Sequence, residues 1–458
     1  MIENDAFKLL LINLFHLNPD DITNIVCTTF NKMMVLLVTL ADKHQACPYC
    51  GFTAPKIKEY VTKEITHSAL TTQKCIIKYR ARRYKCSCCG KTYYEFNPFV
   101  FKSQKISILT VHNILKDLKD FNETFTSVAR RYHVSPTSVS TIFDNHVDIG
   151  RNPLPEIINF DEVYAFKSEK SKYVCVLLDF KKQIPVDVLP NRKKEYLLNY
   201  FQKIPLEERK KVKYACSDMY EVYRDVVHKV FPEAKHLLDY FHLSQDFHKK
   251  MNEVRIKVMK GYKDNKASDE YYLLKKFNWL LFKNPEDEDK YGRLFDVERE
   301  RKYNSHFKSY MNYYDLRKKL LEINNDLTIC YSLKLELVDF YSKSTIDNAQ
   351  VNLEHLIRNC IDTNIEEMIK FSNNLINWKQ EIINSFTIVD TEYKVEADKG
   401  QVVVCNKKVN NAIIENRNKI IKCIKNNANG YTNWSRFRNR VMYVLDPNTT
   451  FSLEPREK

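Results

Sequence analysis

Two acidic residues, each at the end of a short apolar run, are the residues of this sequence best suited to catalytic chemistry. Asp161 closes the run that begins at Ile157, and Asp218 closes the run that begins at Val212. Apolar runs of this length are typical of buried strands. Two carboxylates at the ends of neighbouring strands can hold divalent metal ions against a phosphodiester. An aspartate that ends a strand is also a common structural feature, so the catalytic interpretation depends on the surrounding segments.

The elements that would position these carboxylates follow one another between residues 155 and 243. The apolar spacing predicts the order three strands, helix, strand, helix, strand. After the run into Asp161, we expect an antiparallel pair at 172–180 and 183–189, a helix at 193–201, a strand at 212–216, a helix at 221–230 and a strand at 234–238. This is the order of a ribonuclease-H-like core.

Further acidic residues and one histidine could complete such a site. Asp239 and His242 follow the last expected strand, where Asp239 could equally be the N-cap of a helix. Metal-dependent phosphoryl transfer in this core normally uses an acid on a later helix, and the late candidates are Glu392, Glu396 and Glu415. Because a glutamate within a helix is usually a solvated surface residue, spacing alone leaves the third acid open.

Two Cys-x-x-Cys pairs, each followed directly by a glycine, predict a metal site of another kind. The pairs are Cys47 with Cys50 and Cys86 with Cys89. Four thiolates at this spacing suit one tetrahedral Zn²⁺, which would be structural because no ligand position is left for a substrate. Free thiols or redox chemistry are the alternatives.

Residues 125–143 have the pattern of a compact helix-turn-helix. Ala129 is small where two helices would cross, and Ser135 can cap a second helix. The positions expected to contact DNA are Thr137, Ser138 and Thr141 on the second helix and Arg130 and Arg131 on the first. Helical hairpins that bind nothing are also frequent.

Composition points to a polyanionic partner. The 458 residues include 73 Lys and Arg against 58 Asp and Glu, a net charge of +15, and nucleic acid is the usual partner of such an excess. No apolar stretch reaches the about 20 residues that a membrane span needs. Because the acidic N-terminus is unlike a signal peptide, we expect a cytoplasmic location, where the 13 cysteines would be free or metal-bound.

The overall expectation is a multidomain protein with α+β and α/β parts. Residues 244–400 are charged, aromatic-rich and almost free of Gly and Pro, which predicts a helical insertion. The expected order is an N-terminal region with a zinc ribbon at 1–100, a helix-turn-helix at 101–150, the first part of the ribonuclease-H-like core at 155–243, the insertion at 244–400, and a last helix with a basic tail at 401–445.

Several of these segments together resemble one known family. Near the N-terminus these are the first Cys-x-x-Cys-Gly segment at 47–51 and the run at 82–86. Further along the chain they are Phe-Asp-Glu-Val at 160–163, Ser-Asp-Met at 217–219, Asp-Tyr-Phe-His at 239–242 and Gly-Tyr-Thr-Asn-Trp at 430–434. They are similar to the zinc ribbon, the catalytic strands and the closing signature of the ISL-three family of bacterial insertion-sequence transposases, part of the DDE superfamily. The resemblance covers nearly the whole chain.

The resemblance implies a function and a third acid. Counting back from the segment at 430 places the family's catalytic glutamate on Glu415, although its Glu-Gly-x-Asn-Asn motif reads Glu-Asn-Arg-Asn-Lys here. The family's activity implies a transposase that binds terminal inverted repeats and target DNA. It would cleave and transfer strands with two Mg²⁺ held by Asp161, Asp218 and Glu415, acting as a homodimer or larger oligomer. A DNA-binding regulator that has lost catalysis is the alternative, and a nuclease without strand transfer is a third interpretation.

Overall fold

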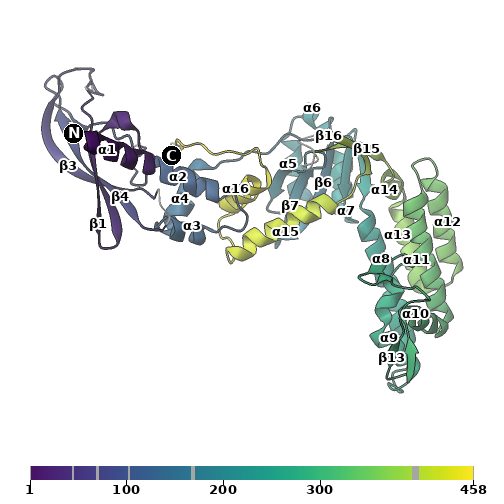
Figure 1. Cartoon of the computed structure of the whole chain (residues 1–458). Coiled ribbons are helices and arrows are strands. Elements are labelled where there is room, and N and C mark those ends of the chain that lie inside the picture. Colours follow the sequence, from purple (N-terminus) through teal and green to yellow (C-terminus); the bar gives the residue numbers. More distant parts are fainter. Residues whose placement is uncertain are drawn as a thin grey trace.

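The computed structural model describes residues 2–43, 46–68, 72–101, 104–166, 171–394 and 402–456. The molecule is elongated, with a lobe at each end of a central sheet that helices cover (Figure 1). Its strands form several separate sheets. The chain is therefore a mixed α/β protein, and at this level the expected fold class is confirmed. Among the described residues, no helix combines the length and the apolar character that crossing a membrane requires.

The N-terminal lobe is a sheet with the strand order β1-β2-β4-β3, and β5 pairs with β4. Its strands are β1 (Ile22–Phe30), β2 (Met33–Leu40), β3 (Lys56–Thr66), β4 (Cys75–Lys85) and β5 (Thr92–Tyr94). Helix α1 (Ile2–Leu14) packs on this sheet through Leu11 and Ile12. Strand β1 was not expected from the sequence, because most of its side chains are exposed and its apolar pattern is weak.

Three short helices follow, α2 (Ile108–Asp117), α3 (Phe125–Arg131) and α4 (Pro136–His146). They enclose a small core that includes Val111, Ala129 and Phe143, and Tyr443 from the far end of the chain completes it. Thr124 and Ser135 cap α3 and α4 by accepting hydrogen bonds from backbone N–H groups. His133, in the turn between these helices, has a positive φ of 54°.

The central sheet has the order β10-β9-β6-β7-β8. Its strands are β6 (Ile157–Tyr164), β7 (Tyr173–Asp179), β8 (Pro185–Leu189), β9 (Tyr214–Ser217) and β10 (Lys235–Leu238). Strands β9 and β10 run parallel to β6, whereas β7 is antiparallel to both of its neighbours, β6 and β8. The helices between these strands are α5 (Lys194–Gln202), α6 (Leu206–Arg209) and α7 (Glu221–Val230). Apart from the short helix α6, which was not expected, these elements follow one another in the order that the apolar spacing predicts.

Helices from two separate parts of the sequence cover the two faces of this sheet. On one face, α5 and α7 pack against Ile158 and Phe160 of β6. On the other face lie α15 (Ala412–Asn427) and α16 (Trp434–Leu445). In Figure 1, α15 crosses the sheet as the long yellow helix. The sheet is therefore buried on both sides, which explains its nearly continuous apolar strands.

The lobe at the other end lies between β10 and α15 in the sequence and has its own apolar core. Its helices are α8 (Tyr240–Gly261), α9 (Asp269–Lys276), α10 (Tyr313–Glu322), α11 (Asn325–Lys343), α12 (Ala349–Asp362), α13 (Glu366–Asn377) and α14 (Lys379–Asn384). Two small hairpins interrupt them: β11 (Glu288–Asp289) with β12 (Gly292–Arg293), and β13 (Lys302–Asn304) with β14 (Ser309–Met311).

The segment at 244–400 was expected to be a mainly helical insertion, but its C-terminal end contains a strand. Strand β15 (Ile388–Lys394) pairs with β16 (Val402–Lys408). The strand-forming segments Ile-Val-Asp-Thr at 388–391 and Val-Val-Val at 402–404 are rich in β-branched residues, which favour strands over helices. Glu392 belongs to β15, and Glu396 lies outside the described residues.

Candidate active site

Three parallel strands bring three aspartates to one edge of the central sheet. Asp161 lies on β6, Asp218 directly follows β9 and Asp239 directly follows β10. Strand β6 does not end at Asp161 as expected but continues to Tyr164. Since Asn159 is paired with Cys216 of β9, and Ser217 with Leu238 of β10, Asp161 still lies level with Asp218 and Asp239. One ligand atom from each of Asp218, Asp239 and His242 lies within 4.8 Å of the other two. The sequence motifs that seemed separate therefore contribute to one site.

Helix α15 supplies the opposite wall of this site. Asn411, Glu415 and Asn418 are spaced so that they share one face of the helix. The Asn418 amide donates to Oδ2 of Asp161 at 2.7 Å, and the Asn411 amide donates to Oδ1 of Asp218 at 3.0 Å. Glu415 lies between the two asparagines, at the edge where the aspartates meet.

His242, in the first turn of α8, holds the Asp218 carboxylate from the other side. Its Nε2 lies 2.8 Å from Oδ1 of Asp218 and 4.0 Å from Oδ2 of Asp239. Burial lowers the pKa of His242, but the hydrogen bond and charge of Asp218 outweigh burial and raise it above its usual value. The contact with Asp218 thus favours the protonated ring, which would add positive charge beside two carboxylates.

Crowding of carboxylates shifts the protonation of this site. The pKa of Asp161 is raised to about 8, mainly by burial and further by the charges of Asp218 and Glu415. Burial also raises the pKa of Asp239 to about 6, and Asp218 and Glu415 add to the effect. A divalent cation with a preference for oxygen ligands would remove this repulsion, so the residues fit Mg²⁺.

An open cleft of about 880 Å³ leads from the surface to this edge. Asp218 and His242 line it on the side of the central sheet, and Asn374 and Trp378 line it on the side of the helical lobe. Lys249 of α8 adds a positive charge to its wall. A phosphodiester in this cleft would lie next to Asp218.

The structure places the residues expected from the sequence as follows. Asp218, Asp239 and His242 form one close group, and Asp161 and Glu415 are not members of it. Asp161 and Glu415 are linked to it by electrostatic interactions with Asp218 and Asp239. Asp239 also accepts the Asn411 N–H at 3.3 Å, so it contacts α15 rather than only beginning α8.

Sequence reasoning missed the asparagines that join β6 to α15. Asn159 is fully buried, and its amide donates to Oδ1 of Asn411 at 2.8 Å. A signal for both was present, since Asn159 precedes Asp161 by two residues of a strand and Asn411 precedes Glu415 by four residues of a helix. These spacings place each asparagine on the same face as its acid.

The two cysteine pairs converge beside the N-terminal sheet. The Sγ atoms of Cys47 and Cys89 are 3.7 Å apart, and those of Cys50 and Cys86 are 3.5 Å apart. Four thiolates around Zn²⁺ at about 2.3 Å would have sulfur–sulfur distances of roughly 3.8 Å. The arrangement is therefore close to that of a tetrahedral zinc site, and all four sulfurs form one group.

Glycines make the two turns around these sulfurs possible. Gly51 and Gly90 have φ values of +74° and +69°, which side chains rarely adopt. The Cys89 N–H donates to Sγ of Cys86 at 3.5 Å, and the pKa of Cys86 is lowered to about 7, mainly by this contact. A thiolate is thereby favoured where a metal would need one.

The helix-turn-helix presents α4 to solvent through a small set of polar residues. Thr137 and Thr141 are exposed, as is Arg130 on α3. The Ser138 hydroxyl lies 2.8 Å from that of Ser135 and is thus engaged in the cap of α4. Thr137, Thr141 and Arg130, which were expected to contact DNA, are therefore accessible from solvent.

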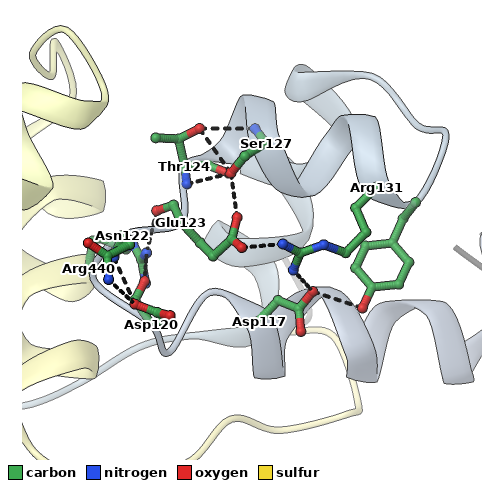
Figure 2. A network of polar contacts seen from close by, with 9 residues as sticks. Asp117, Asp120, Asn122, Glu123, Thr124, Ser127, Arg131 and Arg440 are labelled. Carbon is green, nitrogen blue, oxygen red and sulfur yellow. Dashed lines mark hydrogen bonds and ion pairs between the residues drawn. The ribbon is translucent and has the colours of Figure 1, made fainter.

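Arg131 has a different role from the one expected. It forms ion pairs with Asp117 of α2 and Glu123, and Figure 2 shows its guanidinium between these two carboxylates. It therefore stabilises the packing of the helices, and its charge is already balanced within the protein.

Comparison with known proteins gives two matches. A family model described as transposase, for the ISL3 type of the DDE group, matches residues 158–397, just over half of the chain. The transposase for insertion sequence element IS1001 of Bordetella parapertussis is 19% identical over 408 residues, which cover 89% of this chain and 90% of that protein. The family match includes Asp161, Asp218, Asp239 and His242, and Glu415 follows it.

Proposed function

Because the chain belongs to the ISL3 family of DDE transposases, we propose that it binds the terminal inverted repeats of an insertion sequence and catalyses Mg²⁺-dependent strand cleavage and strand transfer. The observation that carries this proposal is the meeting of Asp161, Asp218 and Asp239 at one sheet edge, opposite Glu415 on α15. The family implies a ribonuclease-H-like core with catalytic divalent metals, and the mixed central sheet between β6 and β10 is the part that fits it.

In this proposal, Asp161, Asp218 and Glu415 hold two Mg²⁺ ions, and Asp239 is a fourth carboxylate beside them. When bound, the ions would activate the attacking water or 3′-hydroxyl and stabilise the leaving oxygen. Asn418 and Asn411 orient the carboxylates of Asp161 and Asp218 by donating a hydrogen bond to one oxygen of each. His242 fixes Asp218 from the side of the cleft.

The proposed DNA binding rests on residues 1–150. Cys47, Cys50, Cys86 and Cys89 would hold one structural Zn²⁺. Thr137, Ser138 and Thr141 of α4 would face the inverted repeat, and Arg130 would contact the phosphate backbone. We further propose that the protein acts on paired DNA ends as a homodimer or larger oligomer.

The experiment that tests catalysis replaces each carboxylate by its amide in the full chain. Asp161→Asn, Asp218→Asn and Glu415→Gln should each lower Mg²⁺-dependent cleavage of a labelled inverted-repeat duplex by on the order of 10³-fold or more, because metal ligands act as a unit. Binding of the same duplex in a gel shift should persist, since the proposed DNA contacts lie elsewhere.

Glu233→Gln is the matched control, because Glu233 is exposed and precedes β10, at the opposite end of that strand from Asp239. It should cleave like the parent. If Glu415→Gln also cleaves like the parent, Glu415 is not the third acid, and Glu392 and Glu396 become the next candidates. If all the amide variants cleave normally, the transposase mechanism proposed for this site is wrong.

A further inference from the structure

A second group of possible metal ligands lies away from the carboxylate edge. His228 comes from α7, His236 from β10 and Glu381 from α14. One ligand atom of each lies within 4.8 Å of the other two. Nε2 of His228 is 3.9 Å from Oε1 of Glu381. The three residues belong to elements of the central sheet and of the helical lobe, so the group sits where these two parts meet.

His236 has one ring nitrogen that lacks a partner. The residue is 1% exposed, and its Nε2 lies 2.8 Å from the Ser217 hydroxyl. The other nitrogen, Nδ1, is buried without a hydrogen bond. A buried polar atom in this state destabilises the folded protein. Because Nε2 is engaged by Ser217, Nδ1 is the atom available to a ligand.

We propose that His228, His236 and Glu381 bind a Zn²⁺ ion that fastens the helical lobe to the central sheet. Two imidazoles and a carboxylate are a common donor set for Zn²⁺, whereas Mg²⁺ prefers oxygen ligands and water. Glu381 is 5% exposed and supplies a negative charge, and His228 is exposed. Water can therefore complete the coordination from an adjoining cleft of about 490 Å³.

The positive charges that line this cleft are occupied by other partners. Arg224 donates to the Asn377 carbonyl at 2.9 Å and lies 4.3 Å from the centre of the Trp378 ring. Nζ of Lys379 is 2.6 Å from Oε1 of Glu354. These contacts reduce the repulsion that a cation would meet at His228 and Glu381.

The position of the site indicates what the ion would stabilise. The Asn384 amide already donates to the His236 carbonyl at 2.9 Å, which joins α14 to β10. Ser217, the hydroxyl partner of His236, directly precedes Asp218. A metal at Nδ1 would leave Nε2–H to donate to Ser217, and it would thereby fix the strand end that carries Asp218.

The test measures zinc in the full-length chain, purified without chelator and kept in excess Mg²⁺ so that oxygen-rich sites hold Mg²⁺. The parent should contain one more zinc equivalent per chain than His228→Ala and Glu381→Gln. His355→Ala, an exposed histidine on α12, should match the parent. Added Zn²⁺ should raise the melting temperature of the metal-depleted parent more than that of His228→Ala.

Cobalt substitution separates this site from the cysteine site. In His228→Ala, the thiolate-to-cobalt absorption bands should persist, while one equivalent of bound Co²⁺ is lost. Equal zinc content in the parent and in His228→Ala, with both proteins folded by circular dichroism, would overturn the proposal. Since metal content and not cleavage is measured, this result is independent of whether the carboxylate edge is catalytic.

Discussion

At the scale of single residues, the Asp161 carboxyl is held by amide groups. Oδ2 of Asp161 accepts from the Asn418 side chain at 2.7 Å and Oδ1 accepts from the Glu162 N–H at 2.6 Å. Neutral donors fix the position of a carboxylate but balance little of its charge. In the metal-free protein, burial therefore raises the pKa of Asp161 to about 8, and a bound metal ion would favour its charged form instead.

The raised pKa of Asp161 predicts how the stability of the metal-free protein depends on pH. The pKa of Asp161 is raised from 3.8 to about 8, so the folded state binds this proton more tightly than the unfolded chain. The stabilisation is complete below pH 4 and is lost as the pH rises toward 8. The free energy of unfolding should fall by at most about 1.4 kcal/mol per pH unit from this group. Urea unfolding at several pH values should show this loss in the parent and a smaller one in Asp161→Asn.

Added Mg²⁺ should reduce the slope of the unfolding free energy against pH, because the ion favours the charged carboxylate of Asp161. The exposed Asp347→Asn serves as a control and should keep the slope of the parent. A slope that is unchanged in Asp161→Asn would contradict the assignment to Asp161.

At the scale of elements, α16 joins the helix-turn-helix to the central sheet. Arg440 is 1% exposed and donates to the carbonyls of Asp120 and Glu123, both at 2.8 Å. Figure 2 shows Arg440 beside the loop that precedes α3. On the other side, Arg438 is 2.7 Å from Oδ1 of Asp187 on β8. One helix thus sets the position of α2, α3 and α4 relative to the sheet.

Replacing Arg440 with methionine should therefore weaken this junction. The change leaves two carbonyls without their donor, and we expect the free energy of unfolding to fall by about 2–4 kcal/mol. Arg456→Met is the control, because Arg456 is 43% exposed and pairs only at the surface with Asp148. Arg456→Met should change the free energy of unfolding by no more than about 0.5 kcal/mol. Urea denaturation measures both, and equal losses would show that Arg440 is not a main contact.

The cysteine group predicts a local rather than a global effect of its loss. Cys47→Ser should lower bound zinc by one equivalent per chain and speed hydrogen exchange at 46–52 and 84–94, where Tyr84 and Tyr93 pack on the cysteines. Exchange at 157–238 should not change, since that sheet has its own core. Cys88→Ser is the matched control, because Cys88 is exposed and is not part of the group. Equal zinc in both variants would contradict the site.

The same elements show how far sequence reasoning reaches. Short-range patterns located Asp218 at the end of a strand and paired the four cysteines, because each signal is contained within a few residues. They also placed Asp161 on a strand, but they ended that strand too early, since β6 continues to Tyr164. Asn411 was not found, because its role depends on a contact between β6 and α15, which lie far apart in the chain. The partners of Arg131 are only 14 and 8 residues away in the chain, but these contacts depend on how α3 packs against α2 and on the loop between them. Strand β1 was missed because few of its side chains are buried.

At the scale of the whole molecule, a net charge of +15 and an elongated shape (Figure 1) suit binding along DNA. If Arg130 contacts a phosphate, Arg130→Ala should weaken binding to all duplexes alike and reduce the slope of log affinity against log salt by about 1. Thr141→Ala should instead reduce the preference for the inverted repeat. Arg358→Ala, on the exposed side of α12, is the control. A slope unaltered by Arg130→Ala would exclude that contact.

The distance along the chain between contacting residues has a consequence for protein synthesis. Asn418 meets Asp161 across 257 residues, and Arg440 meets Asp120 across 320 residues. At translation rates of about 5–20 residues per second, Asp161 waits roughly 13–50 s for the helix that orients it. A nascent chain still on the ribosome, or a product of premature termination before α15, therefore has neither a complete carboxylate edge nor an anchored helix-turn-helix. Such chains would be unable to cut the DNA near which they are made.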